Sequence, residues 1–391
     1  MQRTLQTEQG DGEVRGSLSA LALLFLRLGV TAFGGPAVHV AIMENEVVRR
    51  RRWLTPERFV DLLGAANLIP GPSSSELAIY IGYEAAGWRG LLVAGGCFIL
   101  PAAALTAVIA WAYVRLGNVL QVGGVLYGIK PVVIAIVVQA LWRLAPKAVR
   151  RSWGLACVGA AAGVASAMAV SPLAILLGAG VASIAARRGA GHAGERVFGA
   201  PALATLTGGA AASAPASVGL LTLFFTFVKI GAVVYGSGYV LLAFLRADFV
   251  DRLHWLTESQ LLDAVAVGQV TPGPVFTAAT FIGYVVGGAW GAVLATAGIF
   301  LPGFILVAAT RPLIARVRRS AAAGAFLDGV NVASLGLMAV VTVQLTRAAI
   351  VDVPTLLLGV ASGALLLLTG VSSTWLVLGG AVAGAVLRSV A

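Results

Sequence analysis

The chain has 391 residues, of which 59% are hydrophobic and only 11% charged, and its formal net charge is +11. A soluble domain carries roughly 25% charged residues, so this composition excludes an ordinary soluble fold. Apolar runs close to the ~20 residues that cross ~30 Å of hydrocarbon recur from residue 18 to the C-terminus. The sequence therefore predicts an all-α, polytopic membrane protein.

The excess of positive charge does not indicate a nucleic-acid partner. The arginines stand in short clusters between apolar runs, at residues 49–52, 143–151 and 311–319. Such clusters are typical of cytoplasmic loops under the positive-inside rule. Residues 1–17 mix acidic and basic side chains, unlike the basic start of a signal peptide, so we expect them to form an N-terminal tail.

Several motifs of the first half return about 202 residues later in the second half, with small changes. This repetition predicts a first repeat at residues 18–186, a cytoplasmic linker at residues 187–217 and a second repeat at residues 218–391. The recurring motifs are Arg-Trp-Leu-Thr at 52–55 (His-Trp-Leu-Thr at 254–257), Phe-Gly-Gly at 33–35 (Tyr-Gly-Ser at 235–237) and Pro-Gly-Pro at 70–72 and 272–274.

Loops that are basic in one half correspond to loops with few basic residues in the other. If basic loops are cytoplasmic, the two halves have opposite orientations, as in the inverted repeats of secondary transporters. Inversion requires an odd number of spans in each half, which gives about 10 transmembrane helices in total. The spans that we expect in the first half are residues 18–43, 88–112, 122–142, 153–170 and 172–186.

The apolar stretches at residues 59–86 and 260–286 are expected to return to the side from which they enter the membrane. Each has Pro-Gly-Pro near its middle. Proline lacks an N–H group and disfavours the helical conformation in the preceding residue, and glycine permits a positive φ. We therefore expect two re-entrant or broken hairpins.

The Phe-Gly-Gly-Pro stretch at residues 33–36, the basic Arg-Trp-Leu-Thr loop and the Pro-Gly-Pro triplets resemble the chromate ion transporter family of ChrA-type proteins. The resemblance extends over about residues 18–390 and includes the fused two-domain form. It implies a multi-pass protein of the cell inner membrane that exports chromate and confers chromate resistance. Import or exchange of sulfate or another oxoanion stays open, because sulfate and chromate have nearly the same charge and shape.

The helix that starts after each Pro-Gly-Pro break is a candidate anion site, because a helix N-terminus offers free N–H groups and a partial positive charge. Hydroxyl and amide side chains beside the breaks add further donors. The alternative is a kink that serves packing alone. The candidate substrate-binding residues are Asn67, Pro70, Gly71, Pro72, Ser73, Ser74, Ser75, Gln269, Thr271, Pro272, Gly273 and Pro274.

Arg27, its repeat mate Lys229, and Lys130 are single cations within apolar runs. A charge at the bilayer centre costs about 2.5–3.5 kcal/mol on insertion scales, so we expect an anion or an acid to compensate them. Snorkelling toward the headgroups is the alternative for Arg27. Glu76 has no acidic repeat mate, and it is either the ion-pair partner of Arg27 or Lys130 or a proton relay.

The glycine-rich stretches are the last candidates. Gly34 and Gly35, with their mates Gly236 and Ser237, either permit close helix packing or allow unwinding beside the substrate. Asp61 and Asp263 are expected to cap helices.

His39 has no second histidine or cysteine nearby, so we expect a core histidine, no metal and no cofactor. ATP-binding and nucleophile motifs are also missing from the sequence, so we expect no enzyme. Chromate, with sulfate as a second candidate, and membrane lipid are the expected partners, and a homodimer stays open. The rival interpretations are a cation or proton-coupled transporter using Glu76 and a membrane protein that transports nothing.

Overall fold

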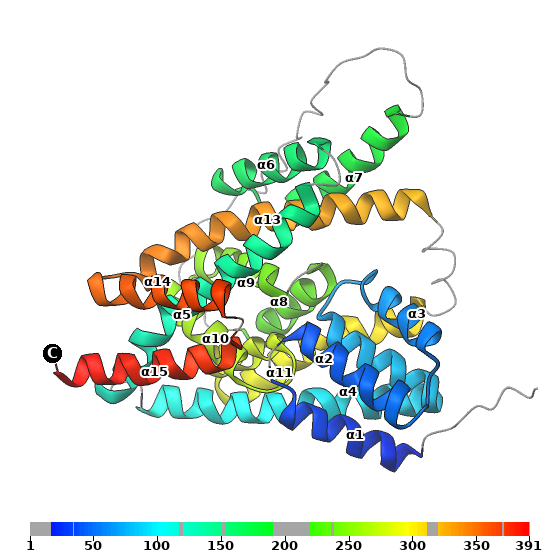
Figure 1. Cartoon of the computed structure of the whole chain (residues 1–391), viewed down its shortest axis with the longest axis horizontal. Coiled ribbons are helices and arrows are strands. Elements are labelled where there is room, and N and C mark those ends of the chain that lie inside the picture. Colours follow the sequence, from blue (N-terminus) through cyan, green and yellow to red (C-terminus); the bar gives the residue numbers. More distant parts are fainter. Residues whose placement is uncertain are drawn as a thin grey trace, which may run out of the picture.

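The computed structural model describes residues 17–33, 35–116, 120–149, 153–190, 219–235, 238–310, 320–369 and 371–390. Over these residues every regular element is a helix, which confirms the all-α prediction (Figure 1). The elements of the first half are α1 (Leu18–Thr31), α2 (Pro36–Glu44), η1 (Asn45–Arg50), α3 (Pro56–Ala66), α4 (Ser73–Leu116), α5 (Leu120–Val149), α6 (Trp153–Ala167) and α7 (Pro172–Ala190).

The second half repeats this order. η1 and η3 are π-helical, and both lie immediately before the Trp-Leu-Thr motif. The elements of the second half are α8 (Leu220–Val233), η2 (Gly238–Val240), α9 (Leu241–Leu245), η3 (Arg246–Arg252), α10 (Glu258–Val270), η4 (Val275–Thr277), α11 (Ala278–Thr310), α13 (Ala321–Ala349), α14 (Val353–Leu368) and α15 (Ser373–Val390).

The Trp-Leu-Thr motif starts a helix in both halves. The Thr55 hydroxyl accepts a hydrogen bond from the Arg58 amide at 3.2 Å, and Thr257 forms a capping box with Gln260. The prediction that Asp61 and Asp263 cap these helices is therefore wrong, because the threonines hold the cap positions and both acids lie inside the helices.

Helices α4 and α11 each consist of two arms that fold back on each other. Positive φ angles of 60° at Gly87 and 64° at Gly288 make the two turns. The arms then approach backbone to backbone, so that a Cβ atom on Gly82 would lie only 2.3 Å from the Gly90 carbonyl oxygen. The first arm of α4 lies in the expected hairpin at residues 59–86, and the second arm covers the expected span at 88–112.

The two halves exchange their last helices. Helix α4 packs against α11 and α5 against α13, which places equivalent helices together at the centre. Helix α5 also packs against α14 and α15, whereas α13 packs against α6 and α7 (Figure 1). The contacts correspond in detail: a Cβ atom on Gly128 would lie 2.0 Å from the Gly380 carbonyl oxygen, and one on its mate Gly329 would lie 2.4 Å from that of Ala179.

Two expected boundaries need correction. The span at residues 18–43 is two helices, α1 and α2, because Ala32 is extended and Gly35 has a positive φ. Helix α7 continues to Ala190, four residues into the expected linker. The N-terminal tail, most of the linker and the basic stretches at 150–152 and 311–319 lie outside the described residues.

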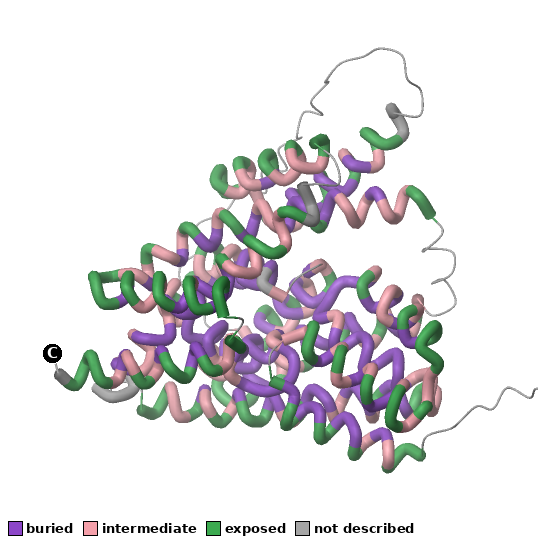
Figure 2. Tube along the Cα trace, in the orientation of Figure 1, coloured by how far each residue is buried: buried purple, intermediate pink, exposed green. Residues whose placement is uncertain are grey.

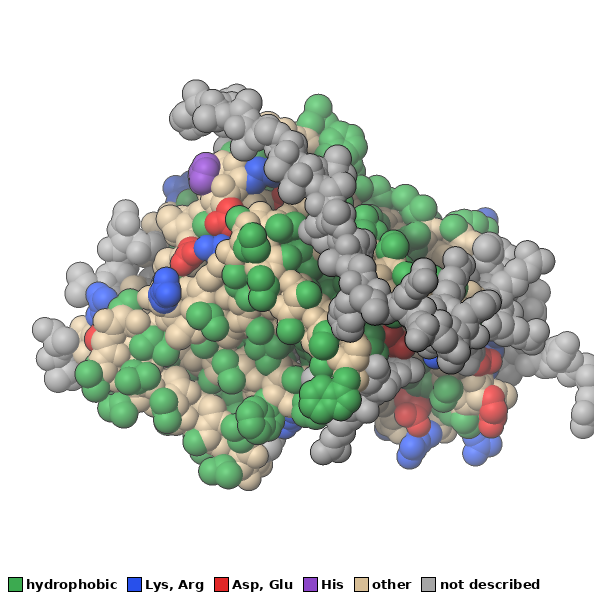
Figure 3. All heavy atoms as spheres, turned by 90° about the horizontal axis from the view of Figure 1, so that it is seen from above, with side chains coloured by type: hydrophobic (Ala, Val, Ile, Leu, Met, Phe, Trp, Pro, Cys, Tyr) green, Lys and Arg blue, Asp and Glu red, His purple; other side chains and the backbone are tan. Residues whose placement is uncertain are grey.

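Within the part of the chain that the structure describes, four helical segments are long and apolar enough to cross a membrane, namely α4, residues 123–146, residues 275–310 and α13. Six shorter apolar helices accompany them. Burial is greatest around α4 and α8–α11, and exposed residues are common on α6, α14 and α15 (Figure 2). On the face drawn in Figure 3, hydrophobic side chains are exposed over a wide area, and the charged side chains form small groups on the left and at the lower right.

We predict that Gly82→Ala and Gly283→Ala lower the midpoint of thermal unfolding in detergent, because each new methyl group overlaps a backbone carbonyl of the facing arm. Overpacking of this kind costs about 1–3 kcal/mol. The matched control is Gly96→Ala on the same helix α4, where a Cβ atom meets nothing within 4 Å. Equal midpoints for Gly82→Ala and Gly96→Ala would contradict the close approach of the arms.

Candidate functional site

Both Pro-Gly-Pro triplets interrupt the backbone between a helix that ends and a helix that begins. Helix α3 ends at Ala66 and α4 begins at Ser73, and α10 ends at Val270 before η4 begins at Val275. Gly71 has φ +126° and Gly273 has φ +83°, conformations that glycine adopts without strain. The triplets are therefore true breaks rather than kinks in continuous helices.

A second pair of interruptions follows α1 and α8. Helix α1 ends at Thr31 and helix α8 ends at Val233, and Ala32 and Val234, which follow them directly, have extended conformations. Gly35, with φ +82°, restarts the chain as α2. Gly34, Gly236 and Ser237 belong to these stretches but lie outside the described residues.

The two kinds of break are hydrogen-bonded to each other across the halves. The Gly71 amide donates to the Val234 carbonyl at 2.8 Å, and the Gly273 amide donates to the Ala32 carbonyl at 2.9 Å. Gly273 and Val234 lie 202 residues after Gly71 and Ala32, so the two bonds are equivalent. We call these two hydrogen bonds the crossed bonds; each joins one half of the chain to the other.

His39 contributes to only one of the crossed bonds. Its Nε2 atom lies 3.0 Å from the Ala32 carbonyl oxygen, which also accepts from Gly273. Because a carbonyl only accepts, Nε2 is the protonated nitrogen of this ring. The ring is buried and lies edge-on to Phe98. His39 is therefore a core histidine that is hydrogen-bonded to the backbone at the break after α1. The equivalent residue in the second half is Leu241, which cannot form this bond.

The start of α4 holds a group of buried polar side chains without hydrogen-bond partners. Ser74, Ser75 and Glu76 are at most 1% exposed. Neither serine hydroxyl and neither Glu76 carboxyl oxygen has a partner within the part of the chain that the structure describes. The Pro72 carbonyl accepts the amides of Ser75 and Glu76, which leaves the amides of Ser73 and Ser74 without a carbonyl in their own helix.

At the equivalent place in the second half, the hydroxyl groups are hydrogen-bonded to nearby backbone carbonyls. The Thr277 hydroxyl, which corresponds to Ser75, donates to the Pro274 carbonyl at 2.9 Å. The Thr271 hydroxyl donates to Val267 at 3.0 Å and lies 3.5 Å from the Thr106 hydroxyl. Gln269 is buried, whereas its mate Asn67 is exposed. The buried polar side chains without partners therefore lie at the start of α4 and not at the equivalent place in the second half.

Lys130 lies in an ion pair that joins the halves and not at the start of α4. Its ammonium group is 3.4 Å from Asp263 Oδ1 and 2.5 Å from the Ser259 hydroxyl. The Tyr113 hydroxyl donates to Asp263 Oδ2 at 3.0 Å. The expected ion pair between Glu76 and Lys130 is thus wrong, because Asp263 already compensates Lys130.

Arg27 and Lys229 also lie apart from the start of α4. Arg27 is exposed on α1. Lys229 is 2.5 Å from Asp248, which also binds Arg252 at 3.0 Å. An acid therefore compensates Lys229, which is one of the two expected possibilities. An ion pair between Arg27 and Glu76 is excluded, because Glu76 has no partner among the described residues.

Sequence reasoning missed the acid that compensates Lys229. Asp248 corresponds to Glu46, which pairs with Arg50 at 2.7 Å and with Arg51. Both acids are buried in the π-helical segments η1 and η3, which follow α2 and α9. Their spacing of 202 residues is a signal in the sequence that could have found them.

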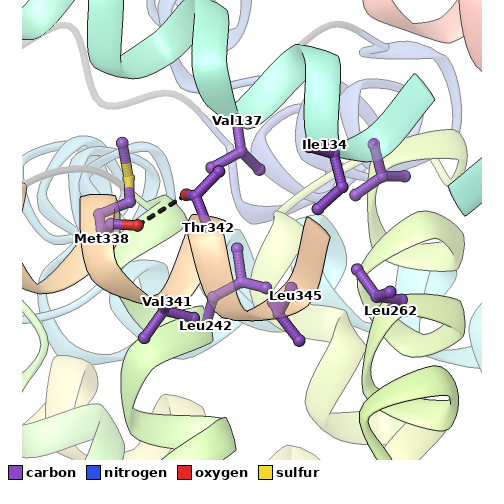
Figure 4. Close-up of a pocket in the computed structure, with 9 residues that line it drawn as sticks. Ile134, Val137, Leu242, Leu262, Met338, Val341, Thr342 and Leu345 are labelled. Atoms are coloured by element: carbon purple, nitrogen blue, oxygen red, sulfur yellow. Dashed lines mark hydrogen bonds between the residues drawn. The ribbon is translucent and has the colours of Figure 1, made fainter. Parts of the chain in front are cut away.

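An apolar pocket lies where α5, α9, α10 and α13 meet (Figure 4). Thr342 is the one polar side chain among its nine lining residues, and its hydroxyl donates to the Met338 carbonyl at 2.6 Å. A pocket with this lining has no free donor for an anion, so it does not compete with the start of α4 as an anion site.

Taken together, long apolar helices, paired broken helices and a buried donor group beside one break define a multi-pass membrane protein with transporter architecture. Residues 19–184 and 221–385 match the chromate transporter family. The chain belongs to this family.

Several members of the family resemble the chain over most of their length. A chromate transport protein of Cupriavidus metallidurans is 34% identical, over 90% of this chain and 88% of that protein. A probable chromate transport protein of Synechococcus elongatus is 32% identical over 88% of each. A chromate transport protein of Pseudomonas aeruginosa is 31% identical, over 86% of this chain and 82% of that protein. No solved structure matches the chain.

We predict that Lys130→Met destabilises the protein by about 3–5 kcal/mol, because it leaves Asp263 as an uncompensated buried charge. The matched control is Arg49→Met, which breaks an exposed pair with Glu44 and costs about 0–1 kcal/mol. Chemical unfolding in detergent measures both, and Lys130→Met combined with Asp263→Leu should recover most of the loss. Equal stability of the two single variants would contradict the role of this ion pair.

Proposed function

We propose that the chain is a secondary transporter that exports chromate across the cell inner membrane and thereby confers chromate resistance. The observation that carries this proposal is the unpartnered pair of buried hydroxyls, Ser74 and Ser75, at the N-terminus of α4. Hydroxyls and free amides at a helix N-terminus suit an anion. The names of the relatives from Cupriavidus metallidurans and Pseudomonas aeruginosa specify the anion as chromate.

In this proposal the oxoanion binds at the start of α4 and takes hydrogen bonds from Ser73, Ser74 and Ser75. The crossed bonds hold Gly71 and the break after α8 beside it. Residues of the second break, Gln269 to Pro274, and the glycine-rich stretches around Gly34, Gly35, Gly236 and Ser237 form the walls. Asn67, Pro70 and Pro72 complete the first break. Lys130, Arg27 and Lys229 do not contact the anion in this proposal. Lys130 and Lys229 stabilise the fold through their ion pairs, and Arg27 lies at the surface.

The membrane potential is sufficient to drive export. Moving one charge through 100 mV is worth about 2.3 kcal/mol, so a dianion that leaves a negative cytoplasm gains about 4.6 kcal/mol per 100 mV. Import of the same ion would require a coupling ion. We therefore propose outward transport down the electrical gradient, with the linker between the repeats in the cytoplasm.

We further propose that the repeats have inverted topology and that the site opens alternately to the two sides. The basic loop at residues 49–52 corresponds to a loop with only Arg246 and Arg252 in the second half, which supports opposite orientations. The exchange of the last helices keeps the two repeats together while the hairpins change position.

We predict that purified protein in liposomes transports chromate, and that the rate rises when an imposed potential makes the starting compartment negative. Labelled chromate flux measures this directly, with empty liposomes as the control. Sulfate is measured in the same vesicles: faster movement of sulfate than of chromate would replace chromate with sulfate as the substrate. Failure of both anions to move would refute the proposed function.

We predict that Ser74→Ala with Ser75→Ala weakens chromate transport, with a rise in KM of tenfold or more. A hydrogen bond to a charged group is worth about 1.5–3 kcal/mol. The matched control is Thr277→Ala, the repeat mate of Ser75, whose hydroxyl is bound to Pro274. An equal effect of Thr277→Ala, in protein that reaches the membrane at normal levels, would remove the serines from the site.

A further inference from the structure

Glu76 lies at the start of α4, within the candidate site. It is fully buried, three residues into α4, next to the unpartnered serines. Its carboxyl group fills the space above Gly71: a Cβ atom on Gly71 would lie 1.8 Å from Glu76 Oε1. On the other side it faces α11 of the second half, where a Cβ atom on Gly303 would lie 3.3 Å from the same oxygen. Glu76 therefore contacts both halves at the break.

No positive group compensates this carboxyl group within the described residues, since neither oxygen has a hydrogen-bond partner. The ionisable groups on the surrounding helices are engaged or directed elsewhere. On α1, Arg27 is exposed, and on α2, His39 binds Ala32. On α3, Arg58 pairs with Glu84, and Glu57 and Asp61 are acids. On α4 itself, Arg89 and Arg115 are exposed, Tyr80 binds Thr310 and Tyr113 binds Asp263. On α10, Asp263 pairs with Lys130 and Glu258 with Arg246, and α11 and η4 carry no charged residue.

A carboxylate in this position would be unfavourable for two reasons. Burying an ionised group without a partner costs several kcal/mol. A dianion bound to Ser74 and Ser75 would add repulsion between like charges at close range. A neutral carboxylic acid avoids both costs and supplies an O–H donor to the bound anion.

We propose that Glu76 carries a proton whenever the oxoanion occupies the site, so that one proton travels with each anion in the same direction. This inference rests on the proposed function and specifies its coupling. The proton binds one carboxyl oxygen on loading and leaves it on release, and the anion itself remains a dianion. The position equivalent to Glu76 in the second half is Ala278, so this pair of positions provides one proton site per chain.

The proposal changes the charge that moves. A dianion alone carries two negative charges, whereas a dianion with one proton carries one. The outward driving force therefore falls from about 4.6 to about 2.3 kcal/mol per 100 mV. Transport also becomes slower as the pH of the loading compartment rises, because the ionised form of Glu76 excludes the anion.

The test uses the full chain in liposomes with an enclosed pH indicator and chromate at alkaline pH, where chromate is a dianion. Three proteins are compared: the unmodified chain, Glu76→Gln as a mimic of the protonated acid, and Glu84→Gln as the control, since Glu84 lies on the same helix in an ion pair with Arg58. We expect the unmodified chain and Glu84→Gln to move one proton with each chromate ion and to slow as pH rises. Glu76→Gln should exchange chromate at a rate that is independent of pH and should move no protons.

Chromate flux in the unmodified chain without any proton movement would overturn the coupling and leave the proposed function intact, whereas the absence of any anion flux would refute the proposed function itself. Proton movement that persists in Glu76→Gln, or loss of chromate exchange in that variant when it is folded, would also overturn the role of Glu76. If the variant does not fold, the unmodified chain in liposomes decides by itself. Chromate flux that moves no protons, or that does not slow as the pH of the loading compartment rises, would refute the proposal.

Discussion

The arrangement at the centre of the protein depends on the crossed bonds. A break in a membrane helix leaves backbone groups without partners where water is absent, and each costs several kcal/mol when buried alone. Here the amides of Gly71 and Gly273 are satisfied by the carbonyls of Val234 and Ala32, which the breaks after α8 and α1 leave free. Each half therefore supplies the partner that the other half lacks. The Pro-Gly-Pro triplet of each half is hydrogen-bonded to the residue that follows the first helix of the other half.

The common backbone carries different side chains in its two halves, so the two breaks are not equivalent. Ser75 corresponds to Thr277, whose hydroxyl is occupied, and Glu76 corresponds to Ala278. His39 fastens one crossed bond, whereas Leu241 stands at the equivalent position of the other. The first half thus holds buried polar side chains without partners at its break, whereas the equivalent hydroxyl of the second half is bound to its own backbone.

Much of this architecture could be predicted from the sequence, because helix breaks and helix starts are local properties. The Pro-Gly-Pro triplets located both helix breaks, and the spacing of about 202 residues related the motifs of the two halves. The ion pairs could not be predicted in the same way. Lys130 and Asp263 are 133 residues apart and meet only because α5 reaches α10 across the halves. Lys229 finds Asp248 because the chain turns back after the break following α8. The exchange of the last helices is likewise set by packing of glycine-lined faces, which no local pattern specifies.

The crossed bonds also restrict the movements that can open the site. Separating the two halves would break both bonds and leave the amides of Gly71 and Gly273 and the carbonyl of Val234 unsatisfied in a dry interior, at a cost of several kcal/mol for each group, whereas the Ala32 carbonyl would keep its hydrogen bond from His39. A rotation about the line that joins the two bonds keeps both of them and still changes the packing on either side of it. The start of α4 lies next to one end of this line, beside Gly71. Under the proposed function, an anion bound there would lie close to this line, where such a rotation displaces the protein least.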